Sequence, residues 1–254
     1  MMETVLIEAS GLTKTYGGVR AVDGLDIRIP EGEVYGFLGP NGAGKSTTLL
    51  MLLGLTQPSA GSARVCGLDP TREARAIKKQ VGYMPENVGF YGDLTAEQSL
   101  AYIAELNGLG RGETVLKIRE ALETVGLPAD EVRGKKVGAF SRGMKQRLGI
   151  AEVLVKEPRV LLLDEPTLGL DPEGARRTIE LVGRLNRDRG ITVVLSSHQL
   201  EQVQRISDRV GIMIRGKLVA EGSIDDLAGD RFGVEGSTGT LEEIYMNQFQ
   251  ESGS

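Results

Sequence analysis

The stretch Val34–Leu53 reads VYGFLGPNGAGKSTTLLMLL, and it contains the pattern that decides the fold. Its first five residues, Val34–Leu38, form a short apolar run of strand type, and Lys45 opens an apolar segment of helical length. Between them lies G-x-x-x-x-G-K-S, which runs from Gly39 to Ser46. A strand, a glycine-rich turn and a helix in this order predict one unit of an α/β fold.

The glycine-rich turn is suited to holding a phosphate chain. Glycine lacks a Cβ, so the backbone can adopt positive φ angles and turn its N–H groups toward a phosphate. The helix that follows adds unpaired N–H donors and the positive end of its dipole. Lys45 is positioned to contact the β- and γ-phosphates. Ser46 is positioned to bind Mg²⁺, which prefers oxygen ligands. We therefore expect nucleotide binding by the residues of this loop, which are Gly39, Pro40, Asn41, Gly42, Ala43, Gly44, Lys45, Ser46 and Thr47.

The composition is that of a globular protein with a large core. Of 254 residues, 40% are hydrophobic and 26% are charged. Thirty basic and 35 acidic residues give a net charge of −5, which argues against a nucleic-acid partner. The single cysteine, Cys66, rules out an intramolecular disulfide bond and fits a reducing compartment. We find no export signal and no apolar run long enough to span a membrane, so we expect any membrane role to come through a partner.

Strands are expected on both sides of the phosphate loop. Before it, residues 4–9 and 25–29 have strand patterns, and the second alternates apolar and polar side chains. Tyr16 lies in the turn between them, and two interpretations of it remain open. It is either a partly buried turn residue or an aromatic face for stacking on a nucleobase. After the loop, residues 61–67 and 81–84 are expected to form two further short strands.

The block from about residue 86 to 155 is predicted to be a helical subdomain inserted into the α/β body. Thr95–Gln98 fits a capping box, and the helix it starts has an apolar face of Leu100, Ile103, Ala104 and Leu106. A second helix is expected over residues 112–125. Ser141 is an N-cap candidate for a third helix.

The C-terminal half alternates buried strands with helices. Val160–Leu163 is a continuous apolar run, typical of a strand buried on both faces of a parallel sheet. A helix with Asp171 as N-cap and Pro172 at its first position is expected to continue to about residue 189. The remaining expected elements are a strand over 191–195, a hairpin of 209–214 with 217–221, and a helix over 240–248.

Five further patterns stand in chain order after the phosphate loop. They are GYMPE from Gly82, FSRGM from Phe140, LLLDE from Leu161, LGLD from Leu168 and SSH from Ser196. Together they resemble the ATP-binding subunit of an ABC transporter over nearly the whole chain. The sequences PENVGFY and SRGMKQRL are most similar to those of cassettes of multidrug-type or ABC-2-type exporters. They also resemble the cassette in the copper-processing system of nitrous oxide reductase maturation.

The resemblance implies a fold and a domain division. The fold would be α/β, a P-loop NTPase core with a mainly parallel sheet, an N-terminal antiparallel β subdomain and an inserted α-helical subdomain. The ATP-binding cassette would occupy residues 1–221. Residues 222–254 would form a C-terminal helical extension and a frayed tail.

Within this resemblance, three residues near strand ends are catalytic or metal-binding candidates. Asp164 follows a buried strand, where ligands of open α/β sheets bind, and a hard carboxylate there suits Mg²⁺. Glu165 is the candidate for positioning the attacking water or accepting its proton. His198, the only histidine, resembles the switch histidine that contacts the γ-phosphate, although a lone histidine is more often structural. With Lys45, Glu165 and His198 form the expected catalytic set.

The resemblance also implies a homodimer or paired cassettes. Ser141 and Gly143 would contact the γ-phosphate of a nucleotide bound to the other cassette of a head-to-tail pair. Asp171 resembles the carboxylate that crosses that interface. The usual signature is L-S-G-G-Q, so Arg142 and Met144 are departures from it. Glu86 stands where glutamine is usual, and its carboxylate is a third candidate ligand for Mg²⁺, beside Ser46 and Asp164.

The expected function is ATP hydrolysis that powers transport by a separate integral membrane permease. The protein would lie in the cytoplasm, on the inner face of the cell membrane, held there by this partner. Residues 86–92 are a candidate docking surface, although Phe90 and Tyr91 could instead belong to the core. Two alternatives remain open: a soluble ATPase of the same class in translation or DNA repair, and a nucleotide-dependent regulator that does not hydrolyse ATP.

Overall fold

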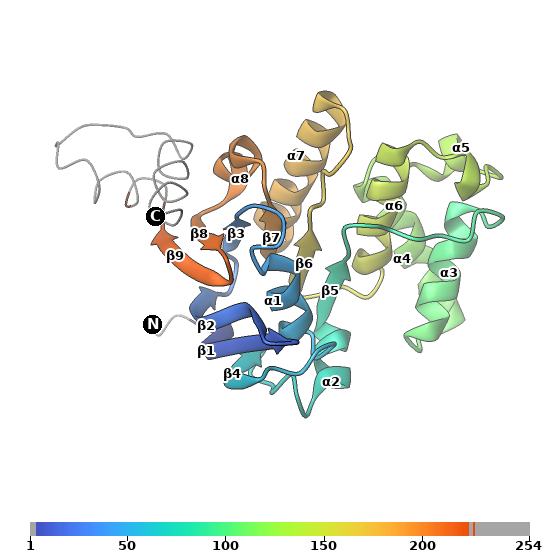
Figure 1. Ribbon diagram of the computed structural model, residues 1–254. Coiled ribbons are helices and arrows are strands. Elements are labelled where there is room, and N and C mark those ends of the chain that lie inside the picture. The colour runs from blue at the N-terminus through green and yellow to red at the C-terminus, as the bar shows by residue number, and fades with distance from the viewer. Residues whose placement is uncertain (1–3, 224–225, 227–254) are drawn as a thin grey trace.

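The computed structural model describes residues 4–223 and residue 226 of the chain. Its centre is a six-stranded sheet in the order β5-β6-β7-β3-β8-β9 (Figure 1). The strands are β3 (Val34–Leu38), β5 (Val81–Met84), β6 (Val160–Asp164), β7 (Thr192–Ser197), β8 (Arg209–Ile214) and β9 (Lys217–Gly222). Neighbouring strands are parallel except β8 and β9, which form the expected hairpin. The mainly parallel sheet predicted from the sequence is confirmed.

The middle strands of the sheet are buried on both faces, as their continuous apolar sequences predict. Every residue of β6 and β7 is buried. Successive side chains of a strand point to opposite faces. Accordingly, Leu161 and Leu163 belong to one hydrophobic cluster, and Val160 and Leu162 to another. The two clusters lie on the two sides of the sheet.

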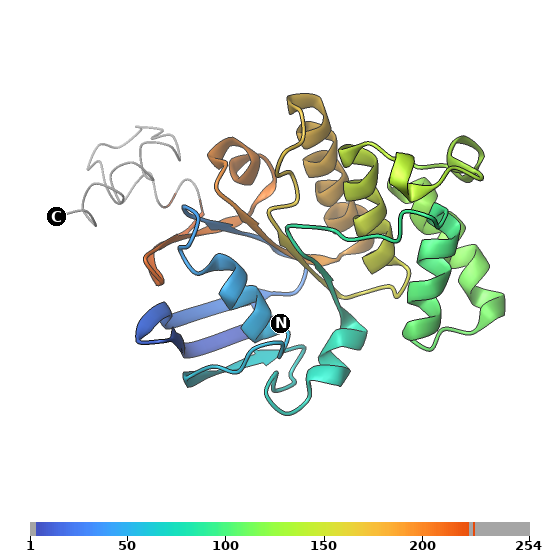
Figure 2. The same ribbon diagram turned by 45° about the vertical axis from the view of Figure 1, so that its right-hand side comes forward.

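One face of the sheet is covered by α1 and a second, antiparallel sheet of order β2-β1-β4 (Figure 2). These elements are α1 (Lys45–Leu52), β1 (Val5–Tyr16), β2 (Val19–Pro30) and β4 (Ala60–Val65). Strands β1 and β2 are longer than predicted and meet at a tight turn. Gly17 and Gly18, with φ of 52° and 87°, form that turn because glycine adopts positive φ freely. The predicted alternation in residues 25–29 is confirmed.

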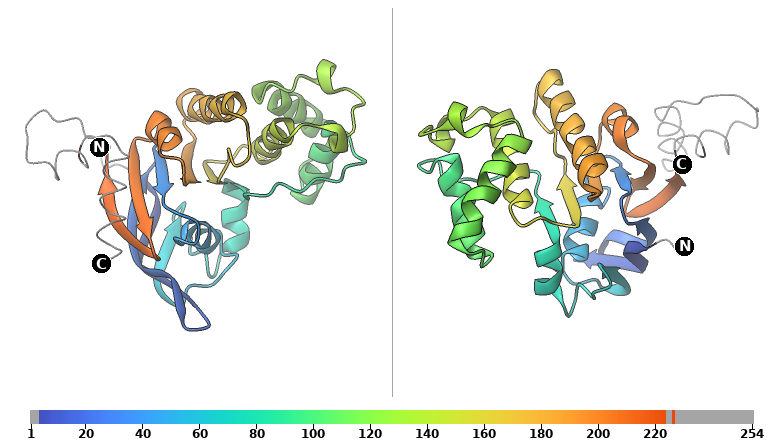
Figure 3. Two further views of the ribbon diagram at one scale, coloured as in Figure 1. Left: turned by 45° about the horizontal axis from the view of Figure 1, so that its top comes forward. Right: turned by 180° about the vertical axis from the view of Figure 1, so that it is seen from behind.

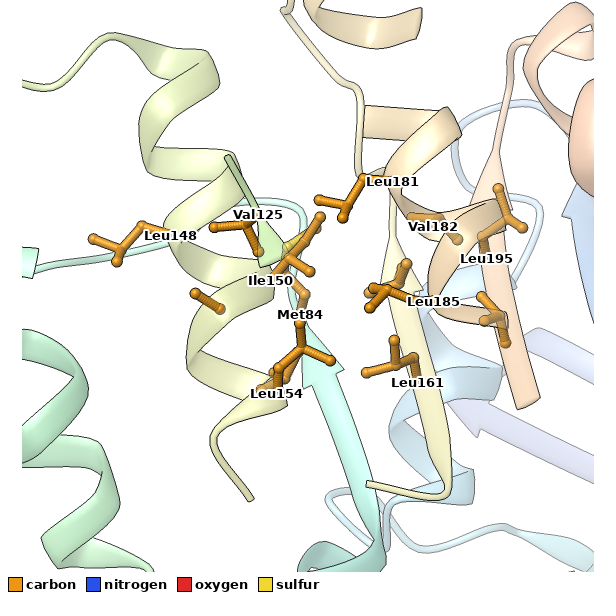
Figure 4. Packing of buried hydrophobic residues seen from close by; sticks show 14 of the residues in the cluster. Met84, Val125, Leu148, Ile150, Leu154, Leu161, Leu181, Val182, Leu185 and Leu195 are labelled. Carbon is orange, nitrogen blue, oxygen red and sulfur yellow. The ribbon is translucent and has the colours of Figure 1, made fainter. Parts of the chain in front are cut away.

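The opposite face is covered by α6 (Arg142–Leu154), α7 (Pro172–Arg189) and α8 (Leu200–Ile206). Figure 4 shows Leu185 of α7 beside Leu161 of β6, and Leu181 of α7 belongs to the same hydrophobic cluster. All three side chains are at least 98% buried. Burial of a leucine side chain contributes about 1.5–3 kcal/mol, so these residues stabilise the packing of α7 on the sheet.

The helices that follow β5 form a group to one side of the sheet (Figure 3). They are α3 (Ala96–Leu106), α4 (Arg111–Thr124), α5 (Ala129–Val132), the 3-10 turn η1 (Val137–Ala139) and α6. The predicted capping box of Thr95 and Gln98 is confirmed, with both reciprocal hydrogen bonds present. The predicted apolar face is wrong at Leu106, which is 66% exposed. Six residues after Leu100, Leu106 lies about 240° around the helix and therefore on its outer side.

Besides the four-residue α5, two helices were not predicted from the sequence, α2 (Ala74–Gln80) and α8. Each has seven residues and one fully buried apolar residue, Ile77 or Val203, so neither shows a helical period. The helix expected over residues 240–248 lies outside the described residues. Within the described part of the chain, no helix combines the length and apolar character that crossing a bilayer requires.

Candidate nucleotide site

The loop between β3 and α1 has the shape of a cradle that glycine makes possible. Gly42 and Gly44 have φ of 81° and 107°. A Cβ on Gly39 would lie 2.2 Å from the carbonyl oxygen of Met213, and one on Gly44 would lie 2.3 Å from that of Ala21. No larger side chain fits at these two positions, so the backbone can approach its neighbours and expose N–H groups to a phosphate.

The loop opens onto a cavity of about 480 Å³. Its lining brings together residues of the antiparallel sheet, the phosphate loop and the segments that follow β5 and β6. They are Tyr16, Ala21, Asn41, Gly42, Ala43, Gly44, Lys45, Ser46, Thr47, Glu86 and Glu165. The other two predicted loop residues, Gly39 and Pro40, do not line the cavity, but their carbonyl oxygens accept hydrogen bonds from Lys45.

Lys45 opens α1 and is 5% exposed. Its Nζ donates hydrogen bonds to the carbonyl oxygens of Gly39 at 2.6 Å and Pro40 at 3.2 Å. The same atom lies 3.3 Å from Oε1 of Glu165. A buried ammonium is stable only with such compensation. The positive charge is therefore fixed at the loop, beside the start of a helix.

A second group of polar side chains lies at the carboxyl ends of β6 and β7. Ser46 Oγ donates to Asp164 Oδ1 at 3.0 Å, and Ser196 Oγ donates to the same oxygen at 2.6 Å. Asp164 is 3% exposed. A hydroxyl and a carboxylate at this separation supply the hard oxygen donors that Mg²⁺ selects. Ser46 and Asp164 therefore fit a magnesium ion, and Glu86, which is exposed, lines the same cavity as Ser46.

Glu165 has an unusual backbone conformation for its residue type, with φ of 48°. Its N–H is held by Ser196, through the carbonyl oxygen at 3.2 Å and Oγ at 3.0 Å. The left-handed region costs a non-glycine residue about 1–3 kcal/mol and is most often found at functional sites. This backbone conformation turns the side chain of Glu165 away from Asp164 and toward Lys45.

The predicted catalytic residues meet at Glu165. One carboxylate oxygen of Glu165 lies near Lys45, and the other, Oε2, is 2.9 Å from Nδ1 of His198. The His198 ring is 34% exposed and does not line the cavity. The structure thus places Lys45, Glu165 and His198 in one chain of contacts.

Two tyrosines lie close to the site. Tyr16 is 49% exposed at the cavity, and its hydroxyl is 3.4 Å from Thr56 Oγ1. An exposed ring at this place favours the stacking interpretation over that of a buried turn residue. Burial, with the charges of Asp164 and Glu86, raises the pKa of Tyr83 to about 12. The Tyr83 hydroxyl therefore stays protonated at neutral pH and can donate a hydrogen bond.

Ser141, Gly143 and Asp171 lie together in a different cavity of about 400 Å³. It has no lining residue in common with the first cavity. Ser141 is the N-cap of α6, as predicted, because its Oγ accepts the N–H of Met144 at 3.2 Å. That contact uses a lone pair, so the hydroxyl hydrogen of Ser141 remains able to donate.

Asp171 occupies the N-cap position of α7, as predicted, but its side chain does not cap the helix. Its carboxylate makes no cap hydrogen bond and lines the second cavity instead. Pro172 takes the first helical position, as expected, because its fixed φ suits that place. The Asp171 carboxylate is therefore free to contact another molecule.

Ser196 is the residue of the site whose role the sequence did not suggest. It touches both Asp164 and Glu165, and it is fully buried. The sequence feature that could have indicated this role is the position of Ser196 as the first residue of the SSH pattern, directly after the apolar run of β7. A hydroxyl at the end of a buried strand is positioned to contact the end of the neighbouring parallel strand.

The sequence profile described as ABC transporter matches residues 22–168. The chain is 43% identical to the bacitracin transport ATP-binding protein BcrA of Bacillus licheniformis, over 88% of this chain and 72% of that protein. It also resembles the solved structure of an ATP-binding subunit of an ABC transporter, with a TM-score of 0.83, 30% identity, and coverage of 96% of this chain and 99% of that one. A dimeric structure of a bacterial ABC transporter cassette matches with a TM-score of 0.75 and 26% identity, over 85% of this chain and 98% of that one.

Proposed function

The chain belongs to the ABC transporter family as an ATP-binding, ATP-hydrolysing subunit, and from that premise we propose how its residues divide this work. The observation that carries the proposal is the separation of the predicted phosphate contacts. Lys45 and Glu165 line one cavity, where Asp164 is hydrogen-bonded to the lining residue Ser46, and Ser141, Gly143 and Asp171 line another. Two such chains arranged head to tail would place one cavity of each kind on every ATP.

In the first cavity, Lys45 binds the β- and γ-phosphates, and the N–H groups from Gly39 to Thr47 surround them. Ser46 and Asp164 hold Mg²⁺, with Glu86 as a further carboxylate for water or metal. When bound, Mg²⁺ neutralises charge that develops on the phosphates. Tyr16 stacks on the nucleobase.

Glu165 positions the attacking water or accepts its proton. His198 keeps Glu165 in place through the 2.9 Å contact and would contact the terminal phosphate of bound ATP. Little covalent chemistry is needed, since catalysis of phosphoryl transfer is mostly positioning and charge stabilisation. The presence of Glu165 and His198 favours hydrolysis over a regulator that only binds nucleotide.

The second cavity contacts the γ-phosphate of the ATP on the other copy. Ser141 donates its hydroxyl hydrogen, and the N–H of Gly143 lies in the first turn of α6, where helix donors are unpaired. Asp171 crosses the interface. The dimeric cassette among the similar structures supports this pairing.

Pairing would drive a membrane permease, because only a ligand with unequal affinity for two states can shift them. This partner holds the protein at the inner face of the membrane. The similarity to a bacitracin transport protein favours export of small molecules over translation or DNA repair. It also favours a drug-type exporter over the copper-processing system.

Residues 86–92 are the proposed docking surface. Tyr91 is 66% exposed and contacts Tyr102 edge-on, with ring centroids 5.8 Å apart, whereas Phe90 packs partly against the core. Changing Tyr91 to alanine should uncouple transport while sparing ATPase activity. The matched control is Leu116→Ala, which removes an equally exposed apolar side chain from α4. Transport that remains coupled in the Tyr91 variant would refute the docking proposal.

The test of pairing is the variant Glu165→Gln. It should bind Mg·ATP, hydrolyse it about 10²- to 10⁴-fold more slowly, and accumulate as a dimer, because the amide cannot accept a proton. Sedimentation with ATP and with ADP measures the dimer, and phosphate release measures turnover. A monomer at all ATP concentrations would refute pairing, and near-normal turnover would refute the assignment of Glu165.

A further inference from the structure

Arg142 begins α6 and lines the second cavity, where this family usually has glycine. Its side chain is exposed, and within the described part of the chain its guanidinium makes no hydrogen bond or ion pair. A guanidinium has five N–H donors in a rigid, planar arrangement that matches a phosphate. The donors of Arg142 are therefore available to a molecule entering this cavity.

The side chain of Arg142 lies against the loop that follows β6. A Cβ on Gly169 would lie 2.4 Å from Cζ of Arg142 and 2.7 Å from its Nη1. The guanidinium thus lies against the Cα of Gly169, and a side chain at position 169 would displace the guanidinium. Gly169 also has φ of 68°, which favours glycine.

The other arginines and the glutamate of this cavity are already engaged, whereas the Asp171 carboxylate has no hydrogen bond or ion pair among the described residues. Arg147 donates to the carbonyl oxygen of Gly126 at 2.5 Å, and Arg177 pairs with Glu173 at 2.9 Å. Hydrogen bonds from Arg176 and Arg177 lower the pKa of Glu173 to about 2, so its charge is balanced within α7. Arg142 is thus the arginine of this cavity that has no partner among the described residues.

Three kinds of donor converge at the N-terminus of α6. They are the hydroxyl of Ser141, the N–H groups of the first helical turn and the guanidinium of Arg142. The positive end of the dipole of this 13-residue helix adds to the attraction for an anion.

We propose that Arg142 binds the terminal phosphate of the ATP held in the first cavity of a second copy of this chain. The inference rests on the head-to-tail pairing proposed above. It assigns to Arg142 a charge-assisted contact that a glycine at this position lacks. Since the contact is made only across the interface, it strengthens ATP-dependent pairing and not the binding of ATP to one chain.

The experiment uses the full chain carrying Glu165→Gln, so that ATP is not consumed. Arg142→Ala and Arg142→Lys are added to it singly. The control is Arg184→Ala, which removes the same charge from an exposed part of α7 outside the second cavity. Sedimentation at several ATP concentrations gives the dimer dissociation constant, and a fluorescent ATP analogue gives the affinity of the monomer.

We expect Arg142→Ala to raise the dimer dissociation constant roughly tenfold or more, as for loss of a hydrogen bond to a charged group. Arg142→Lys keeps the charge without the planar donors and should recover part of the loss. The monomer affinity for the analogue should match that of the parent in every variant. The salt dependence of pairing should fall with Arg142→Ala and stay unchanged with Arg184→Ala.

Equal dimer dissociation constants for the Arg142→Ala and Arg184→Ala variants would overturn this inference and leave the head-to-tail proposal standing. A Glu165→Gln parent that does not pair would overturn the head-to-tail proposal and this inference with it. Reduced monomer affinity in both Arg142 variants would also overturn it, since Arg142 would then support the fold of the chain and not the phosphate of a second copy.

Discussion

The two cavities of this chain differ in how complete they are. In the first, Lys45, Asp164 and Glu165 are at most 5% exposed and contact one another through short polar networks. In the second, Ser141 and Arg142 are exposed. Buried charges interact strongly because little water screens them, whereas exposed charges interact weakly. The first cavity is thus prepared for its ligand by the fold, and the second needs another surface to exclude water.

The difference predicts that one chain binds a nucleotide but does not turn it over efficiently. Phosphate contacts at the first cavity are fixed when the chain folds. Those at the second gain strength only when a facing molecule removes solvent from them. Variants of the first cavity should therefore affect a single chain, and variants of the second should affect the pair.

The largest effect is expected from Lys45→Ala. It removes the cation of the first cavity and leaves the Glu165 carboxylate buried beside no positive charge. Nucleotide affinity should fall at least about a hundredfold, on the order of 3 kcal/mol. Titration with a fluorescent ATP analogue measures it, and Lys79→Ala, which removes an exposed lysine from α2, is the control. Retained affinity would mean that the loop backbone alone binds the phosphates.

Ser141→Ala should distinguish the role of the second cavity in turnover from the role of the first cavity in ATP binding. We expect turnover to fall about tenfold or more, because the variant loses a phosphate donor, while a single chain binds ATP as before. It also loses the N-cap of α6, which costs about 0.5–2 kcal/mol of folding stability. Thr95→Ala loses the N-cap of α3 outside both cavities and controls for this cost. Equal losses of turnover in the two variants would contradict a phosphate contact by Ser141.

Ser196→Ala tests the polar network behind the first cavity. The variant leaves Asp164 with one hydroxyl donor fewer and the N–H of Glu165 with one acceptor fewer. Turnover should fall roughly tenfold, and the Mg²⁺ concentration for half-maximal turnover should rise, since an unmet buried hydrogen bond costs about 1–3 kcal/mol. The control is Ser99→Ala, because Ser99 is a buried serine whose Oγ has no hydrogen-bond partner in the described structure. If the Mg²⁺ concentration for half-maximal turnover stays unchanged, Ser196 does not support the metal ligand Asp164.

The smallest effect is expected from Tyr16→Ala. Loss of a ring that stacks on the base should weaken ATP binding about fivefold, the lower end of the usual range for stacking, since the ring is half exposed. Tyr16→Phe keeps the ring and should bind as the parent does. If both variants bind ATP equally well, Tyr16 does not stack on the base.

Sequence patterns were informative wherever the physical cause is local. The capping box of Thr95, the N-cap of Ser141 and the alternation of residues 25–29 were all predicted from neighbours in the chain. Patterns failed where tertiary packing decides. Helix α8 has one fully buried residue, and the side chain of Asp171 turns to a cavity instead of capping α7.

By itself, the sequence determined the phosphate loop, the buried strands and the family, because glycine freedom, helix starts and apolar runs depend on adjacent residues. Only the tertiary structure decided which side chains meet. Ser46 and Asp164 are 118 residues apart and lie at one cavity because parallel strands bring their carboxyl ends to the same edge of the sheet. Ser141 lies apart from them, since α6 belongs to the group of helices beside the sheet, and the contact of Arg142 with Gly169 follows from how that helix packs.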